Sequence, residues 1–216
     1  MQKVKKSILA ILATLFVGIA MYSCGLLDTI DLKDEKSTTE FLRATLEKHI
    51  DPEAKIFEFH MGTTSDFSLE MNVISLKVLA PGAEIPQDYS ITLPGNQEPR
   101  IRDMNPVFIK MGQYSPEGGL KLADMDFSKI TSNILKVEEL LKEEEVEEGK
   151  GLELSGVSFY GIKIVDGDPA KSIHEITTRS KAGTEFGTQN GRAALTTNYY
   201  EYNFTADSDG NVTIKE

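Results

Sequence analysis

The chain has 216 residues, with 34 acidic side chains against 23 lysines and arginines, and a formal net charge of −11. Such an acidic surface disfavours binding to nucleic acid and to anionic lipid headgroups, and it favours solubility or a basic partner. The length suffices for one full hydrophobic core or for two small ones.

The N-terminus has the parts of a secretory signal peptide. Three lysines within residues 1–6 are followed by the uncharged apolar run 8–21 and then by Cys24, the single cysteine of the chain. A membrane-spanning helix needs about 20 apolar residues, whereas the core of a signal peptide needs roughly 7–15. We therefore expect residues 1–23 to be a signal peptide that directs export.

The segment Met21-Tyr22-Ser23-Cys24 resembles the cleavage site of bacterial lipoproteins in its last two residues, whereas Tyr22 departs from the usual small residue. The resemblance implies that Cys24 carries the lipid, begins the mature chain and attaches it to a membrane. An ordinary signal peptide or a short uncleaved anchor is the alternative. A free thiol would be unusual in an oxidising compartment, which favours lipidation. Removing residues 1–23 leaves 34 acids against 20 bases, a net charge of −14.

A short acidic tether is expected at 24–36. Lys33-Asp34-Glu35 resembles the acidic export tract of surface lipoproteins in the Bacteroidota, although it lies further from the cysteine. Asp28-Thr29-Ile30 resembles the O-glycosylation motif of that phylum, which would make Thr29 the acceptor; an unmodified linker is the alternative. These resemblances imply an outer-membrane lipoprotein on the periplasmic or the cell-surface face.

The first half of the folded body begins with a predicted helix. Ser37-Thr38-Thr39-Glu40 has the form of a capping box, apolar residues then recur at helical spacing to residue 50, and a proline at 52 ends the pattern. Alternating apolar residues in 56–61 and 67–78 predict a β-hairpin packed on this helix. The proline-rich segment 80–106 is expected to be a long loop, of a kind that is often functional, with a short edge strand near residues 89–93.

The second half repeats this order. Asp126 is expected to cap a helix whose apolar stripe extends to residue 141 and whose acidic end lies within 138–148. Strands are predicted at 152–165, 172–180, 198–206 and 211–215, with a tight turn at 207–210 and a flexible glycine-rich hairpin loop at 183–191. These strands would form a three- or four-stranded antiparallel sheet behind the helix.

The predicted fold class is therefore α+β, with two helix-plus-antiparallel-sheet units, at 37–125 and 126–216, packed in one compact body. Their element order resembles the PepSY, cystatin-like and β-lactamase-inhibitor-like modules. That resemblance implies a domain that binds or inhibits other proteins rather than one that catalyses a reaction.

No sequence motif defines a catalytic, cofactor or metal site. The three histidines His49, His60 and His174 lack the local spacing of a zinc site, and the partial calcium-loop pattern at 205–216 lacks the first acidic ligand. An Asp-Gly hairpin turn explains the pattern at 207–210 with fewer requirements.

Aromatic residues are densest in the strand 198–206. Tyr200, Tyr202 and Phe204 share one face, while Tyr199 points to the other. The shared face is expected to belong to the core. An exposed row would instead make Tyr199, Tyr200 and Tyr202 a candidate partner-binding surface.

The sequence thus favours a lipid-anchored envelope protein that binds a protein or a glycan, with no catalytic residues and no cofactor. Two alternatives remain at this point. A pocket with two or more convergent carboxylates, or one that includes His60, would favour a hydrolase. A surface without pockets or apolar patches would favour a structural spacer.

Overall fold

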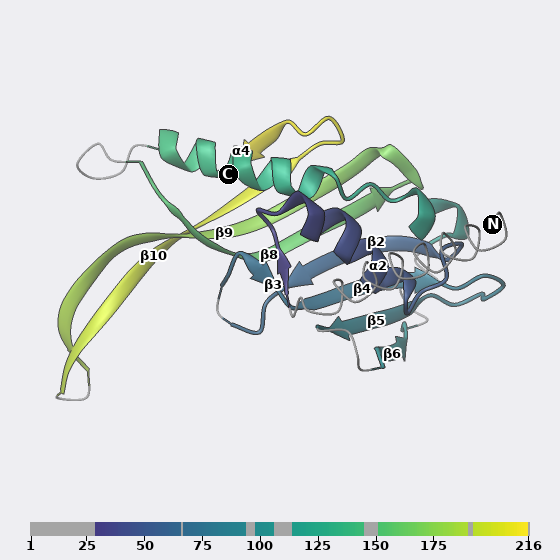
Figure 1. Ribbon diagram of the computed structural model, residues 1–216, viewed down its shortest axis with the longest axis horizontal. Helices are drawn as coiled ribbons and strands as arrows, with labels where there is room; N and C mark the ends of the chain where they lie inside the picture. The colour runs from purple at the N-terminus through teal and green to yellow at the C-terminus, as the bar shows by residue number, and fades with distance from the viewer. Residues whose placement is uncertain are drawn as a thin grey trace, which may run out of the picture.

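The computed structural model describes residues 29–65, 67–93, 98–105, 114–144, 151–189 and 192–215, and the side chains of 116 and 182–198 are not described. One nine-stranded sheet, entirely antiparallel, dominates the fold, with the strand order β11-β10-β9-β8-β2-β4-β5-β6 and with β7 paired to β2 (Figure 1). Its strands are β2 Lys55–Gly62, β4 Val73–Leu79, β5 Gln87–Thr92, β6 Arg100–Asp103, β7 Leu120–Lys121, β8 Leu154–Val165, β9 Asp168–Gln189, β10 Arg192–Ala206 and β11 Val212–Ile214. A small second sheet pairs β1 Ile30–Asp31 with β3 Glu70–Met71.

Two segments contain most of the helical residues in the described part of the chain. The first joins a π-helical turn, η1 Ser37–Phe41, to α2 Leu42–Glu47, and the second is α4 Lys129–Glu143. Two 3-10 turns, η2 Pro116–Gly118 and η3 Leu122–Asp124, precede α4. The α+β class is therefore confirmed, although strands outweigh helices.

Each half of the chain contributes a helix and four consecutive neighbouring strands of the sheet. The main-path strands of the first half are β2, β4, β5 and β6, and those of the second half are β8 to β11. The first strands of the two halves, β2 and β8, pair directly, with Phe59 opposite Ile162. The prediction of a separate sheet for each half was wrong, because this pairing joins both sets of strands. Whether 37–125 and 126–216 are units in their own right stays a prediction.

The core lies between one face of the sheet and the two helices. Helix α4 buries Ile130, Ile134, Val137 and Leu141 completely, which matches the predicted stripe, and the first helical segment buries Phe41, Leu42 and Leu46. On the sheet, the buried face includes Phe59, Met61, Ile74, Leu76, Tyr160, Ile162, Ile176 and Phe204. The opposite face of the sheet carries no helix in the described part of the chain (Figure 1).

The folded body begins earlier than predicted. Ile30 and Leu32 are fully buried in the core, so residues 30–36 belong to the body rather than to a tether. The predicted capping box was also wrong, because the helical segment starts at Glu35 and the side chain of Asp34 accepts the Lys36 amide at 3.1 Å. Ser37 instead accepts the Asp31 amide at 3.0 Å, which ties β1 to the helix.

Part of the predicted loop at 80–106 forms two strands, β5 and β6. Pro86 and Pro99 stand just before β5 and β6, where a missing amide hydrogen interrupts no ladder. The segment near 89–93 is a strand as predicted, but it is not an edge, because β6 pairs on its far side.

The predicted flexible loop at 183–191 is also largely strand. β9 and β10 stay paired as far as Gln189 and Arg192, and their far end extends beyond the body of the sheet (Figure 1). Backbone hydrogen bonds form this ladder, which continues past the glycines at 183 and 187 with one register shift, where Asn198 pairs with Gly183 and Tyr199 with Lys181. The predicted turn at 207–210 is confirmed by the bond from the Gly210 amide to the Asp207 carbonyl, 3.0 Å.

Candidate functional site

The open face of the sheet carries two rows of directly opposed residues across four neighbouring strands. The first row is His60, Ser75, Ser90 and Arg100, from β2, β4, β5 and β6. The second row lies two positions away on each strand and consists of Glu58, Lys77, Asp88 and Arg102. Opposed residues in a sheet point to the same side, so all eight side chains face away from the helices.

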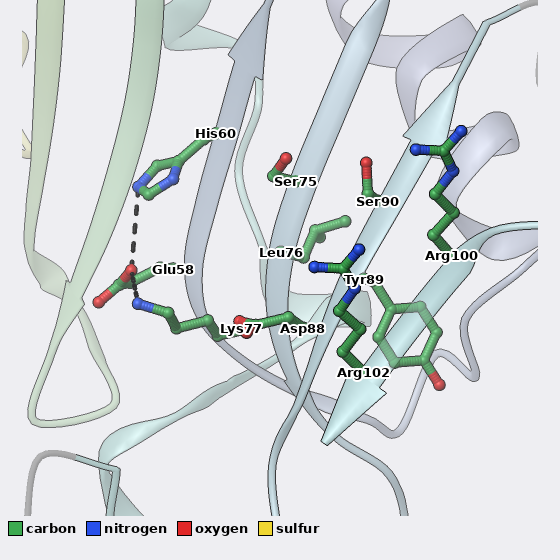
Figure 2. Close-up of a pocket in the computed structure, with 10 residues that line it drawn as sticks. All are labelled: Glu58, His60, Ser75, Leu76, Lys77, Asp88, Tyr89, Ser90, Arg100 and Arg102. Atoms are coloured by element: carbon green, nitrogen blue, oxygen red, sulfur yellow. Dashed lines mark hydrogen bonds and ion pairs between the residues drawn. The ribbon is translucent and has the colours of Figure 1, made fainter. Parts of the chain in front are cut away.

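These two rows line a pocket of about 370 Å³, together with Leu76 and Tyr89. Figure 2 shows the Glu58–Lys77 pair and His60 at one side of the pocket and both arginines at the other. Five of the ten lining residues come from 80–106, the segment that the sequence led us to expect as a loop. The pocket is therefore built where consecutive strands place polar residues side by side.

Glu58, Lys77 and Tyr114 form a closed hydrogen-bonded cluster. The Lys77 Nζ donates to Glu58 Oε2 at 2.6 Å and to the Tyr114 hydroxyl at 2.7 Å, and that hydroxyl donates to Glu58 Oε1 at 2.9 Å. Burial raises the pKa of Glu58, but the hydrogen bonds from Lys77 and Tyr114 outweigh it and lower the net pKa. Burial lowers the pKa of Lys77, whereas its bonds to Glu58 and Tyr114 raise it above the ordinary value. The pair therefore stays ionised at neutral pH.

His60 lies beside this cluster without joining it. Its Nε2 is 4.0 Å from Glu58 Oε2, which is beyond hydrogen-bond distance, and its ring packs against Phe159 with centroids 4.9 Å apart. Burial lowers the pKa of His60, and Glu58 opposes this only in part. The imidazole is therefore neutral at neutral pH and offers one donor and one acceptor.

Two carboxylates share the pocket, but they do not converge. Glu58 is on β2 and Asp88 is on β5, and Lys77 on the intervening strand β4 is the register partner of both. With strands about 4.8 Å apart, the two backbones are roughly 10 Å apart. The pocket thus contains the residue types that a hydrolase would use, with a lysine between the two acids.

A second pocket, of about 280 Å³, lies at the start of α4 and is lined in part by Asp126, Lys129, Ser172 and His174. His174 is buried, and its Nδ1 is 2.8 Å from the Tyr160 hydroxyl. That hydroxyl also accepts a hydrogen bond from Asn133 Nδ2 at 3.2 Å. The imidazole, the phenol and the amide therefore form one buried hydrogen-bonded chain.

The buried histidine predicts a loss of stability in mild acid. Burial, and then the charge of Lys129, lower the pKa of His174 from 6.5 to about 4. The folded protein therefore binds fewer protons than the unfolded chain between these values, and stability falls as the pH drops from about 6.5 to about 4. The difference corresponds to about 3 kcal/mol.

We expect urea titrations between pH 7.5 and 4.5 to show this loss and a His174→Gln variant to show less of it. Glu58, Asp126, Glu138 and other carboxylates with lowered pKa also destabilise the fold in acid, but they do so in both proteins. The difference between the two titrations isolates the histidine. Parallel curves would contradict the assignment.

The predicted site residues have different positions relative to these pockets. Cys24 lies outside the described residues. Thr29 directly precedes β1, with its hydroxyl 3.4 Å from Glu70 Oε2, so its glycosylation remains a prediction. None of the three tyrosines lines either pocket.

The prediction that the face shared by Tyr200, Tyr202 and Phe204 belongs to the core was right only for the last two, because Tyr200 lies beyond the covered part of the sheet. Phe204 is in the core and Tyr202 packs against it, while Tyr200, next on the same face, is 41% exposed. Tyr199 is 42% exposed and lies edge-on to Phe67, with ring centroids 4.7 Å apart. A role of these tyrosines in partner binding stays a prediction.

The partial calcium pattern at 205–216 forms the hairpin turn instead. Asp207 Oδ1 accepts the amides of Asp209 and Asn211, each at 2.9 Å, so its carboxylate is occupied within the turn. Within the described ranges, no group of three His, Cys, Asp or Glu side chains could hold a metal ion. No helix there is long and apolar enough to cross a membrane.

Sequence reasoning missed Lys77, Arg100 and Arg102 as site residues. The sequence did contain a pattern that points to them. Ser75 and Lys77 are polar residues of an alternating strand, and the two arginines are two positions apart, so each pair can lie on one face of a strand. Only the pairing of β4, β5 and β6 shows that these residues meet.

Comparisons with known proteins add little. No family model matches the chain, and no curated protein matches it. A solved structure described as a "putative lipoprotein" of Clostridium difficile 630 is 13% identical, over 82% of this chain and 90% of that chain, with a TM-score of 0.41. This TM-score does not establish a shared fold.

Proposed function

We propose that the protein is an exported, lipid-anchored protein of the outer membrane, and that its folded domain binds a protein or a glycan without catalysing a reaction. The observation that carries the binding role is the polar pocket on the open face of the sheet, with charges of both signs and two serine hydroxyls. A protein that acts only as a structural spacer would not need a polar pocket of this kind.

The anchor is supported by the signal-like N-terminus and by the early start of the folded body. Only five residues, 25–29, separate Cys24 from β1. Even fully extended, they span roughly 18 Å. Lipidation at Cys24 would therefore hold the domain close to the membrane surface, and several acyl chains together would make the attachment stable.

Binding is favoured over catalysis because Glu58, one of the two acids of the pocket, is already engaged. Both Glu58 oxygens accept hydrogen bonds, one from Lys77 and one from Tyr114, and its pKa is lowered. A general acid needs a raised pKa instead. Arranged in this way, Glu58 can fix the position of Lys77 and Tyr114 but has no proton to give at neutral pH.

A hydrolase is the second candidate, because Glu58, Asp88 and His60 line one pocket. If it is correct, the protein should hydrolyse an envelope glycan, and Asp88→Asn or His60→Ala should abolish turnover while leaving binding nearly intact. Binding without turnover across such a panel would favour the non-catalytic role.

The binding role is tested by capture from solubilised envelopes with the full mature chain as bait. Ser90 lies in the middle of the first row, so Ser90→Tyr should fill the pocket and remove the captured protein or glycan. Ser132→Tyr places the same side chain on the exposed side of α4 and should capture as the parent does. Equal capture by both variants, or none by the parent at several salt concentrations, would refute the proposal.

A further inference from the structure

The two rows of the open-face pocket differ in charge. In the second row, acids and bases alternate, with Glu58 opposite Lys77 and Asp88 opposite Arg102. The first row contains no acid, since Arg100 follows Ser90, Ser75 and the neutral His60. Arg100 is therefore the one pocket charge without an opposite charge across from it.

Both guanidinium groups are available to a ligand. β6 is an edge strand in the described part of the sheet, and all four of its residues are exposed. Among the described residues, no ion pair or side-chain hydrogen bond engages Arg100, Arg102, or the hydroxyls of Ser75 and Ser90. These four groups line the pocket with donors that have no partner in the described part of the chain.

The local charge selects the kind of anion. Lys77, Arg100 and Arg102 against Glu58 and Asp88 give the pocket a net charge of +1, on a mature chain whose net charge is −14. A monoanion such as a carboxylate would balance this charge. A dianionic phosphate would leave negative charge beside Asp88 and Glu58. A carboxylate also matches the planar fork of a guanidinium in a bidentate contact.

The rest of the pocket suits hydroxyl groups. Ser75 and Ser90 donate or accept, neutral His60 does both, and Asp88 accepts. The first row crosses three interstrand gaps, roughly 14 Å, which is long enough for several groups of an oligomeric ligand. An apolar anchor for a protein partner would instead need a desolvated apolar centre, whereas the apolar lining here consists of Leu76 and Tyr89.

From these observations we propose that the pocket binds an acidic glycan, with a sugar carboxylate held by Arg100 and Ser90 and assisted by Arg102, and with neighbouring hydroxyls on Ser75, His60 and Asp88. This inference rests on the proposed function and specifies its ligand. Charged residues on an edge strand also prevent strand-to-strand aggregation, and the experiment separates that role from ligand binding.

The test measures binding of the full mature chain to oligogalacturonates and to their methyl esters. We expect the acid to bind at least tenfold more tightly than the ester. Arg100→Gln should remove that preference, so that acid and ester bind alike, and Arg100→Lys should restore only part of it. Arg179→Gln alters an arginine on β9 that is paired with Glu201 outside the pocket, and it should leave the preference unchanged. Unchanged melting temperatures would show that the variants fold.

Three other outcomes would each contradict a stated part of the proposal. Equal binding of acid and ester by the parent, lost in Ser90→Tyr, would overturn the carboxylate assignment and leave the pocket as a binding site. Preference for a polyglutamate peptide over the sugar acid would overturn the glycan assignment in favour of a protein partner. Absence of binding to either sugar would overturn this inference alone, because envelope capture tests the proposed function independently.

Discussion

A Cys24→Ser variant is expected to leave the membrane fraction almost completely, whereas the parent chain should be found almost entirely in it. Each buried acyl CH₂ contributes about 0.8 kcal/mol to membrane attachment, and stable anchoring requires more than one chain. Without the thiol, no acyl chain can be attached. The remaining domain is acidic and is repelled by anionic headgroups, so its own surface supplies no replacement.

Fractionation of cells that express either form checks this expectation, with mass spectrometry of the mature N-terminus. Because an unprocessed signal could itself hold the variant in the membrane, a second form should carry a cleavable secretory signal in place of residues 1–24. Ser23→Ala keeps a small residue before the cysteine and should stay in the membrane fraction. A free thiol at Cys24 in the parent, or membrane binding by the correctly processed form that lacks Cys24, would refute the anchor.

A Phe59→Ala substitution is expected to destabilise the folded domain by about 3–5 kcal/mol, which is a large part of the total stability of an ordinary domain. Phe59 is fully buried on the central strand β2, between Leu76 of β4 and Ile162 of β8. Its ring packs against Phe127, just before α4, with centroids 5.3 Å apart. The substitution therefore opens a cavity where the two halves of the sheet meet the second helix.

Urea denaturation provides the measurement, and two further variants provide the scale. Tyr200→Ala removes an aromatic ring that is 41% exposed, and it should cost less than about 1 kcal/mol. Phe59→Leu keeps most of the buried volume and should cost about 1–1.5 kcal/mol. If Phe59→Ala were no more costly than Tyr200→Ala, the central position of β2 in the core would be wrong.

The elements that could be predicted are those whose pattern is local. The stripe from Ile130 to Leu141 predicted α4, because residues at helical spacing share one face whatever lies opposite. The alternation around Phe59 predicted β2 for the same reason. The segment 80–106 was misread in part, because its prolines suggested a continuous loop, whereas Pro86 and Pro99 stand just before β5 and β6 rather than within them.

The sequence by itself determined the single thiol, the acidic charge and the faces of most helices and strands, and it predicted the N-terminal signal, since each depends on residues close together in the chain or on composition. Only the tertiary structure decided that β2 pairs with β8 and that Arg100 lies in the same pocket as Glu58, 42 positions earlier. Register between strands depends on pairing over distances that no local pattern encodes. The pocket, and the local positive charge on which the proposal of an anionic ligand rests, exist only once that register is set.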